Sequence, residues 1–140
     1  RGERDAPRIG QLLQDDDLMP DMILCSTAER ARQTAALAMA TSGYEGHIHF
    51  TRQLFHAAPR EIIEVACEVD DEIERLLLVG HNPGMNELMT MLTGDARSMP
   101  TAALAVIELP IDAWQALNTR TRGTLVEFWR PRDLRRQTPN

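Results

Sequence analysis

The sequence predicts an α/β domain in three layers, in which helices cover both faces of a mostly parallel sheet. Two short apolar runs, at 22–25 and 76–79, are typical of strands buried on both sides. A segment with the apolar spacing of an amphipathic helix follows each run, and this alternation indicates parallel strands joined by helical crossovers. The length of 140 residues fits one domain, which we expect to span 1–140.

The first half of the chain is expected to hold two helices and two strands. A helix begins near Pro7, which suits a first helical turn, and the acidic turn at 15–17 ends it. A strand follows at 21–26. The Ser-x-x-Glu pattern at 26–29 predicts a capping box and the start of the second helix. A glycine-bounded turn then leads to a strand at 47–51.

The second half is expected to hold strands at 75–80, 102–109 and 124–130, a helix from Pro59, a helix from Pro83 and a short helix at 112–117. Asn82 caps the helix that starts at Pro83, and Gly94 stops it. The last two strands could add an antiparallel edge to the sheet. We expect 133–140 to be a flexible tail.

Composition excludes several classes of protein. The net charge of −6 argues against nucleic acid as a partner, and the longest apolar runs, such as 35–40, are far shorter than the roughly 20 residues that span a membrane. Cys25 and Cys67 show no disulfide pattern, which favours a reducing compartment, and we expect the cytoplasm. All 15 basic residues are arginine, so any recognition of phosphate by a cation uses guanidinium groups.

Two strand-to-helix junctions carry the strongest signs of chemistry. Ser26 ends one expected strand and Arg30 lies in the next helical turn, while His81 and Asn82 follow the leucine-rich strand. Both junctions offer free backbone N–H groups and the positive end of a helix dipole. If they face one crevice, Arg30 could grip two oxygens of a phosphoryl group and His81 could donate to a third. Taken singly, Arg30 also fits a surface residue paired with Glu29, and His81 fits a core histidine.

The other histidines give weaker signals. His47 and His49 share one face of a predicted strand, but no third ligand has suitable spacing, so we expect neither a metal site nor another cofactor. His56 lies in the loop before a helix, where it could donate a proton or be an ordinary loop residue.

Five segments, in order along nearly the whole chain, share a pattern with one known family. They are Arg-Gly-Glu-Arg-Asp-Ala at 1–6, Ser-x-x-x-Arg-x-x-Gln-Thr-Ala at 26–35, Leu-Phe-His-Ala at 54–57, Val-Gly-His-Asn-Pro at 79–83 and Met-Pro-Thr-Ala-Ala at 99–103. Together they resemble the histidine phosphatase superfamily, which has a phosphoglycerate mutase-like fold. Within it they resemble the small phosphohistidine phosphatases of the SixA type.

The resemblance implies a metal-independent hydrolase that forms a covalent phosphohistidine on the enzyme, which water then hydrolyses. Two arginines and a second histidine of the family hold the phosphoryl oxygens. Arg30 matches the second arginine and His81 the second histidine, and we expect Ser26 and Asn82 beside them to bind phosphate. The family's nucleophile lies in an Arg-His-Gly/Ala motif that ends its first strand. These residues contain no such motif, so the nucleophile and the first strand are expected upstream of residue 1.

The resemblance also implies a substrate class. Relatives that act on phosphate esters carry a glutamate near the position of His56 as general acid, and His56 is the candidate proton donor here. We expect the substrate to be phosphohistidine on a protein of a signalling phosphorelay, because no insertion is present to cap a small substrate. A small phosphate ester or phosphoamide is the alternative substrate. A catalytically inactive module that binds phosphate or a phosphoprotein is the alternative function.

Overall fold

Three parallel strands form the centre of the molecule, and two antiparallel strands form a second, smaller sheet. The computed structural model describes residues 2–133, with side chains from Arg4 onward. The strands pair in the orders β2-β1-β3 and β4-β5. Their bounds are β1 Met22–Ser26, β2 Ile48–Thr51, β3 Leu76–Val79, β4 Leu104–Glu108 and β5 Thr124–Trp129. The helices are α1 Gly2–Asp15, α2 Glu29–Ser42, α3 Pro59–Cys67 and α4 Gly84–Thr93, with 3-10 turns η1 Arg52–Leu54 and η2 Trp114–Ala116.

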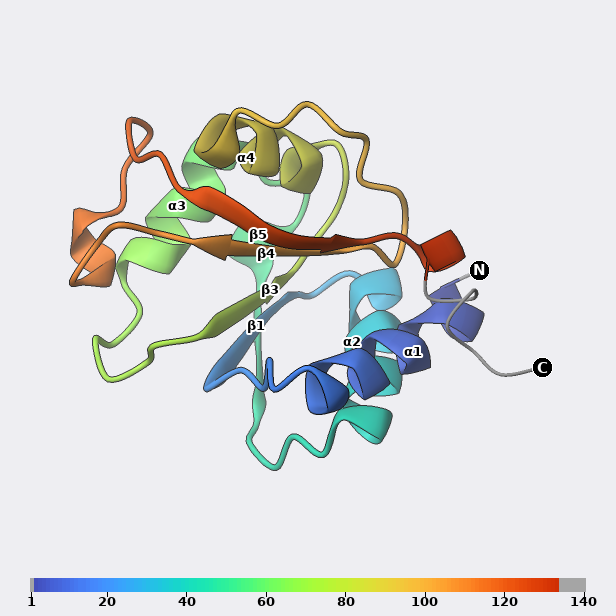
Figure 1. Cartoon of the computed structure of the whole chain (residues 1–140). Coiled ribbons are helices and arrows are strands. Elements are labelled where there is room, and N and C mark those ends of the chain that lie inside the picture. The colour runs from blue at the N-terminus through green and yellow to red at the C-terminus, as the bar shows by residue number, and fades with distance from the viewer. Residues whose placement is uncertain (1, 134–140) are drawn as a thin grey trace.

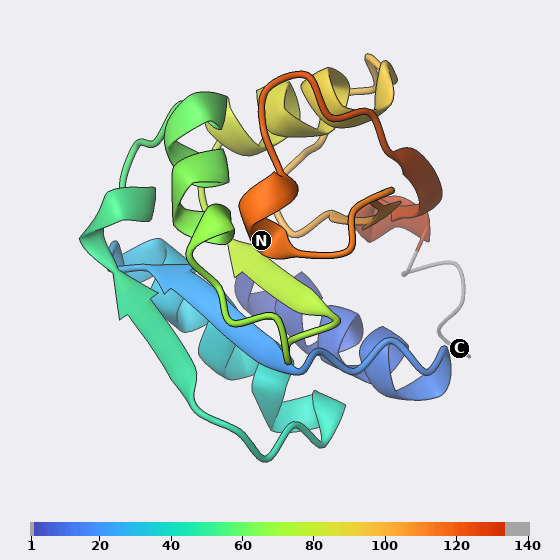
Figure 2. The same ribbon diagram turned by 90° about the vertical axis from the view of Figure 1, so that its left-hand side faces the viewer.

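The predicted three-layer α/β architecture is confirmed. Helices α1 and α2 pack together on one face of the parallel sheet, while α3 and α4 lie on the other (Figure 1). Figure 2 shows β2, β1 and β3 side by side with α1 and α2 behind them. One apolar cluster joins Ile9 and Leu12 of α1 to Ala38 of α2, and another joins Ile62 of α3 to Leu88 of α4. No helix in the described part of the chain has the length and apolar character needed to cross a bilayer.

The capping box expected at 26–29 is wrong. Ser26 pairs with Thr51 as the last residue of β1 and is completely buried. Its hydroxyl oxygen accepts a hydrogen bond from the backbone N–H of Ala28 at 3.2 Å. The strand pairing thus keeps Ser26 in the sheet, and α2 begins at Glu29 with no side-chain cap.

Two other helices start at residues that the sequence did not predict. Helix α1 begins at Gly2 and contains Pro7 in its interior, because Asp5 and Ala6 are already buried and packing extends the helix before the proline. Helix α4 begins at Gly84, with Pro83 as its N-cap. The side-chain Oδ1 of Asn82 accepts from the backbone N–H of Asn86 at 3.2 Å, one residue further along than the N–H groups that an N-cap normally binds.

The last third of the chain is less regular than expected. Ala102 has a left-handed φ of 61°, which prevents extended backbone there, so β4 begins only at Leu104. The helix expected at 112–117 is a single 3-10 turn. The Trp114 indole N–H fastens this turn to the segment before β3 by donating to the carbonyl of Ile73 at 2.6 Å. Most of the predicted tail lies outside the described residues.

Gly84 is required where α4 meets the loop after η1. A Cβ at this position would collide with the backbone carbonyl oxygen of Ala57, next to His56. We therefore expect Gly84→Ala to lower the free energy of unfolding by about 1–3 kcal/mol, as overpacking does. Urea denaturation measures this change, with Glu87→Ala on the exposed side of α4 as the control. Equal stability of the two variants would contradict the close approach.

Candidate active site

The two predicted strand-to-helix junctions meet at the carboxyl end of the parallel sheet. Cys25 of β1 pairs with Val79 of β3, so the residues that follow these two strands leave the sheet together. The Nε2 atom of His81 lies 2.8 Å from the hydroxyl oxygen of Ser26. Arg30, whose side chain is exposed in the first turn of α2, lines the same cavity as His81. The structure therefore brings Arg30, Ser26 and His81 into one site.

His56 joins this site from the segment that follows β2. It follows η1 with a left-handed φ of 51°, a conformation that is uncommon for a residue with a side chain. Its ring centroid lies 5.7 Å from that of His81. The ring of Phe55 makes edge contacts with both histidines, at centroid distances of 4.3 Å to His56 and 5.9 Å to His81.

The Ser26 hydroxyl can hold His81 in either protonation state. The oxygen already accepts the Ala28 N–H, so the hydroxyl hydrogen can be donated to Nε2 of a neutral ring. When the ring is protonated, Nε2–H can donate to the same oxygen instead. In both states Nδ1 remains available to a ligand. The deeply buried Ser26 thus acts on His81 and has no exposed surface of its own for phosphate.

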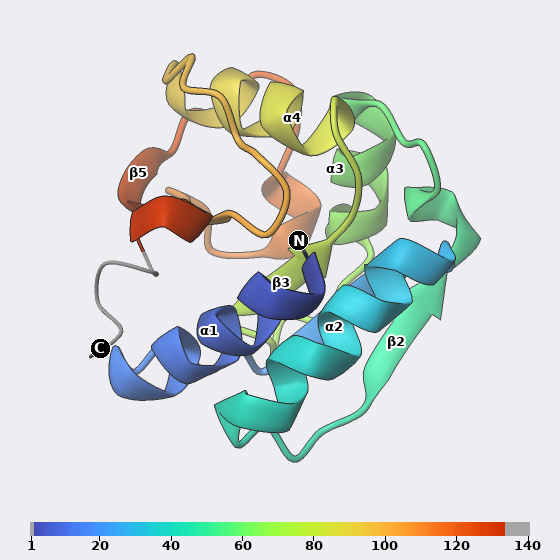
Figure 3. The same ribbon diagram turned by 90° about the vertical axis from the view of Figure 1, so that its right-hand side faces the viewer.

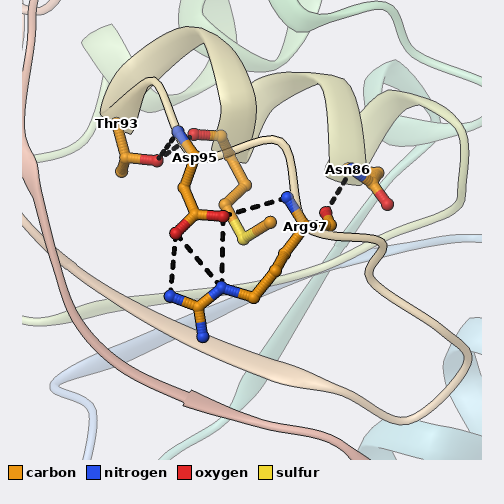
Figure 4. Close-up of polar contacts among 5 residues, drawn as sticks. Asn86, Thr93, Asp95 and Arg97 are labelled. Carbon is orange, nitrogen blue, oxygen red and sulfur yellow. Dashed lines mark hydrogen bonds and ion pairs between the residues drawn. The ribbon is translucent and has the colours of Figure 1, made fainter.

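Asn82 holds a loop beside the site. Its Nδ2 donates to the carbonyl of Met99 at 2.5 Å, and its Oδ1 accepts from Asn86. The side chain of Asn86 in turn accepts from the backbone N–H of Met99. It also donates to the backbone carbonyl of Arg97, and Arg97 forms an ion pair with Asp95 at 2.8 Å (Figure 4). Both amide atoms of Asn82 are thus engaged within the protein, and its bond to Met99 ties the loop that carries Met-Pro-Thr-Ala-Ala to the start of α4.

The remaining predicted positions lie apart from this cluster. His49 is exposed on β2, and His47 precedes that strand. Within residues 2–133, no group of three or more His, Cys, Asp or Glu side chains is arranged to hold a metal ion. Phe55 was not predicted from the sequence as a site residue. Its position next to His56 in the Leu-Phe-His-Ala segment was the signal that could have indicated it.

The environment of His81 lowers its pKa from the ordinary value, first by burial and second by the charge of His56. Because the folded pKa lies below the unfolded value near 6.5, the unfolded state binds more protons, and stability is lost as pH falls below about 6.5. A bound anion stabilises the protonated ring by its charge and so acts against this lowering. We therefore expect sulfate, whose charge is constant near neutral pH, to raise the pKa of His81 in an NMR titration.

Arg30→Ala supplies the control for this titration. The variant should bind sulfate more weakly, so the same sulfate concentration should leave the pKa of His81 nearly unchanged. An equal rise of that pKa in the unaltered protein and in Arg30→Ala would mean that Arg30 does not bind the anion.

A large apolar cavity separates the two sheets and ends at the site. Its volume is about 1030 Å³, and it is lined by β3 and β4, by α1 to α4, and at one end by Arg30 and His81. Among the described residues, β3 pairs only with β1 and β4 pairs only with β5, so each strand leaves one edge unpaired. All four residues of β3, Leu76–Val79, are only half-buried, although their sequence is typical of a fully buried strand.

Solved structures share this architecture. A structure described as a candidate SixA phosphohistidine phosphatase from Nakamurella multipartitia superposes with a TM-score of 0.80 at 23% identity, covering 92% of this chain and 81% of that chain. A similar candidate from Agrobacterium tumefaciens gives 0.70 at 26% identity over 92% and 80%. The histidine phosphatase SixA complexed with tungstate gives 0.77 at 18% identity over 94% and 82%. The fold is therefore that of the SixA-type histidine phosphatases.

The sequence relatives define the family. An uncharacterised protein of Mycobacterium leprae is 31% identical over 94% of this chain and 84% of its own length. An uncharacterised protein of Mycobacterium tuberculosis is 34% identical over 78% of this chain and 73% of its own length. The chain belongs to the same family as these two mycobacterial proteins. No family model matches it.

Proposed function

We propose that this protein is a metal-independent phosphatase that removes the phosphoryl group from phosphohistidine on another protein. The observation that carries the proposal is the convergence of Arg30, His81 and His56 at the carboxyl end of the parallel sheet, in a fold shared with SixA-type proteins. The complex of one such protein with tungstate, an oxyanion, supports an oxyanion as the ligand class.

Arg30 and His81 have complementary roles in this proposal. The Arg30 guanidinium binds two phosphoryl oxygens through its planar fork, and Nδ1–H of His81 donates to a third. The first turn of α2 adds the positive end of its dipole. Ser26 and Asn82 act as positioning residues, one holding the His81 ring and the other the adjacent loop.

The nucleophile is proposed to be a histidine on a further strand that fills the cavity between β3 and β4. The two unpaired strand edges and the apolar lining suit such a strand, because it would satisfy both rows of backbone hydrogen-bonding groups. A residue at its carboxyl end would reach Arg30 and His81. This placement agrees with the resemblance, which puts the nucleophile at the end of a first strand.

The proposed reaction proceeds in two steps. The nucleophilic nitrogen bonds to phosphorus while the P–N bond of the substrate breaks, and a proton passes from His56 or water to the leaving imidazole. Water next attacks the phosphorus of the enzyme phosphohistidine, the P–N bond of that intermediate breaks, and a proton of the water passes to the enzyme's imidazole as inorganic phosphate leaves. His81 and Arg30 stabilise the charge on the phosphoryl oxygens in both steps.

The reducing cytoplasm is the proposed location, because Cys25 and Cys67 are free thiols among the described residues. The proposed partner is a phosphorelay protein, so the activity would act in signal transduction.

The test measures kcat/KM for several substrates, using the protein expressed from its complete coding sequence. A phosphorylated histidine-phosphotransfer domain should be hydrolysed with a higher kcat/KM than a panel of small phosphate esters and phosphoramidate. Faster hydrolysis of a small ester would favour the alternative substrate class. Binding of the phosphoprotein without phosphate release would favour an inactive binding module.

A further inference from the structure

Exposed aromatic side chains gather beside the candidate site. Among the described residues, the exposed large hydrophobic side chains are Phe50, Phe55 and Val126, which are 42%, 48% and 51% exposed. Phe50 lies on β2 and Phe55 follows η1. Because Thr51 pairs with Ser26, the segment after β2 and the first turn of α2 leave the sheet at the same edge (Figure 3). Two of these three exposed side chains therefore flank the site, and Val126 lies on β5.

Two exposed arginines accompany the two phenylalanines, one stacked on a ring and one in the turn that precedes Phe55. Arg32 stacks its guanidinium over the ring of Phe50, 4.5 Å from the centroid. Arg52 lies in η1, where its carbonyl accepts the backbone N–H of Phe55 at 3.0 Å. The segments 26–33 and 50–56 contain three arginines and one carboxylate, that of Glu29. This local excess of positive charge opposes the net charge of −6 of the whole chain.

We propose that Arg32, Phe50, Arg52 and Phe55 form a docking surface for the protein substrate, and that the substrate presents carboxylates around an apolar residue. The proposal rests on the proposed function and names the surface that recognises its partner. Aromatic residues and arginine are the residue types that dominate binding energy at protein interfaces. A guanidinium stacked on a ring keeps its N–H fork free for a carboxylate, and positive charge speeds encounter with an acidic partner.

The docking surface reaches the site through Phe55. Phe55 contacts the rings of both His56 and His81, so a protein bound over Phe55 would present its phosphohistidine directly to them. A small phosphorylated molecule occupies only the anion site and has no atoms to place on Arg32, Phe50 or Arg52. The docking surface therefore separates protein substrates from small ones.

The test uses the double variant Arg32→Glu/Arg52→Glu in the protein expressed from its complete coding sequence. We expect kcat/KM for a phosphorylated, acidic histidine-phosphotransfer domain to fall at least about tenfold, mainly through KM. Hydrolysis of phosphoramidate should change less than about twofold, because the anion site is intact. The matched control is Arg120→Glu/Arg122→Glu in the loop before β5, which makes the same charge change and should spare both substrates. A second pair of variants leaves the charge unchanged. Phe50→Ala should lower kcat/KM for the phosphoprotein, and Val126→Ala, its control on β5, should not.

The outcomes separate docking from catalysis. Equal loss with both substrates, or equal loss in the control variant, would overturn the docking surface. If the unaltered protein hydrolyses neither substrate, the proposed function fails. The affinity for the phosphotransfer domain, measured by calorimetry, then tests the docking surface separately. Weaker binding in Arg32→Glu/Arg52→Glu than in the control would then support the surface, and equal binding would reject it.

Discussion

Replacing Arg30 by alanine is expected to lower kcat by at least about 10²-fold, which is typical of losing one preorganised donor to a developing oxyanion. Arg30 lies in the first turn of α2 and lines the cavity that also contains His81. Its side chain is exposed, so the free energy of unfolding should change by less than about 0.5 kcal/mol. Steady-state kinetics with the phosphoprotein measures the first effect and urea denaturation the second.

Two further variants, Arg30→Lys and Arg120→Ala, serve as the conservative replacement and the surface control. Lysine keeps the charge but loses the fork that binds two oxygens, so most of the loss should remain. Arg120 is exposed in the loop before β5, and its replacement should leave kcat unchanged. Wild-type turnover in Arg30→Ala would remove Arg30 from the site.

The second large effect is expected for His81→Asn, which should lower kcat by about 10²–10³-fold. Asparagine removes the ring that Ser26 holds and that donates to the phosphoryl group. The variant should also lose the part of the pH profile that reports the lowered pKa of His81. His47→Asn is the matched control, because His47 is exposed and precedes β2. An unchanged pH profile in His81→Asn would mean that another group titrates in the reaction.

The fold was largely predictable because its strands have strong local signals. The apolar runs that became β1 and β3 are short and bounded by polar residues, so their position followed directly from the sequence. Helix starts were less predictable, because Ser26 has the side chain of a cap but is retained in β1 by its pairing with Thr51. A local pattern cannot reveal which of two hydrogen-bonding arrangements the tertiary structure selects.

The site was predictable at the level of chain topology and less so at the level of side chains. Arg30 and His81 follow neighbouring parallel strands, so their convergence could be expected from strand order. The bond between Ser26 and His81 and the contact of Asn82 with Met99 depend on side-chain rotamers that no spacing encodes. The roles of all these residues in phosphate chemistry stay predictions until the variants are measured.

The proposed mechanism requires a covalent phosphohistidine intermediate on a histidine that these 140 residues do not contain. The most direct measurement is rapid quenching of the protein, expressed from its complete coding sequence, during turnover of a radiolabelled phosphohistidine protein. We expect a label on the enzyme that acid releases and base preserves, on a peptide containing none of the four histidines of this sequence. An active, rapidly quenched enzyme with no label, or with the label on His56 or His81, would contradict this mechanism.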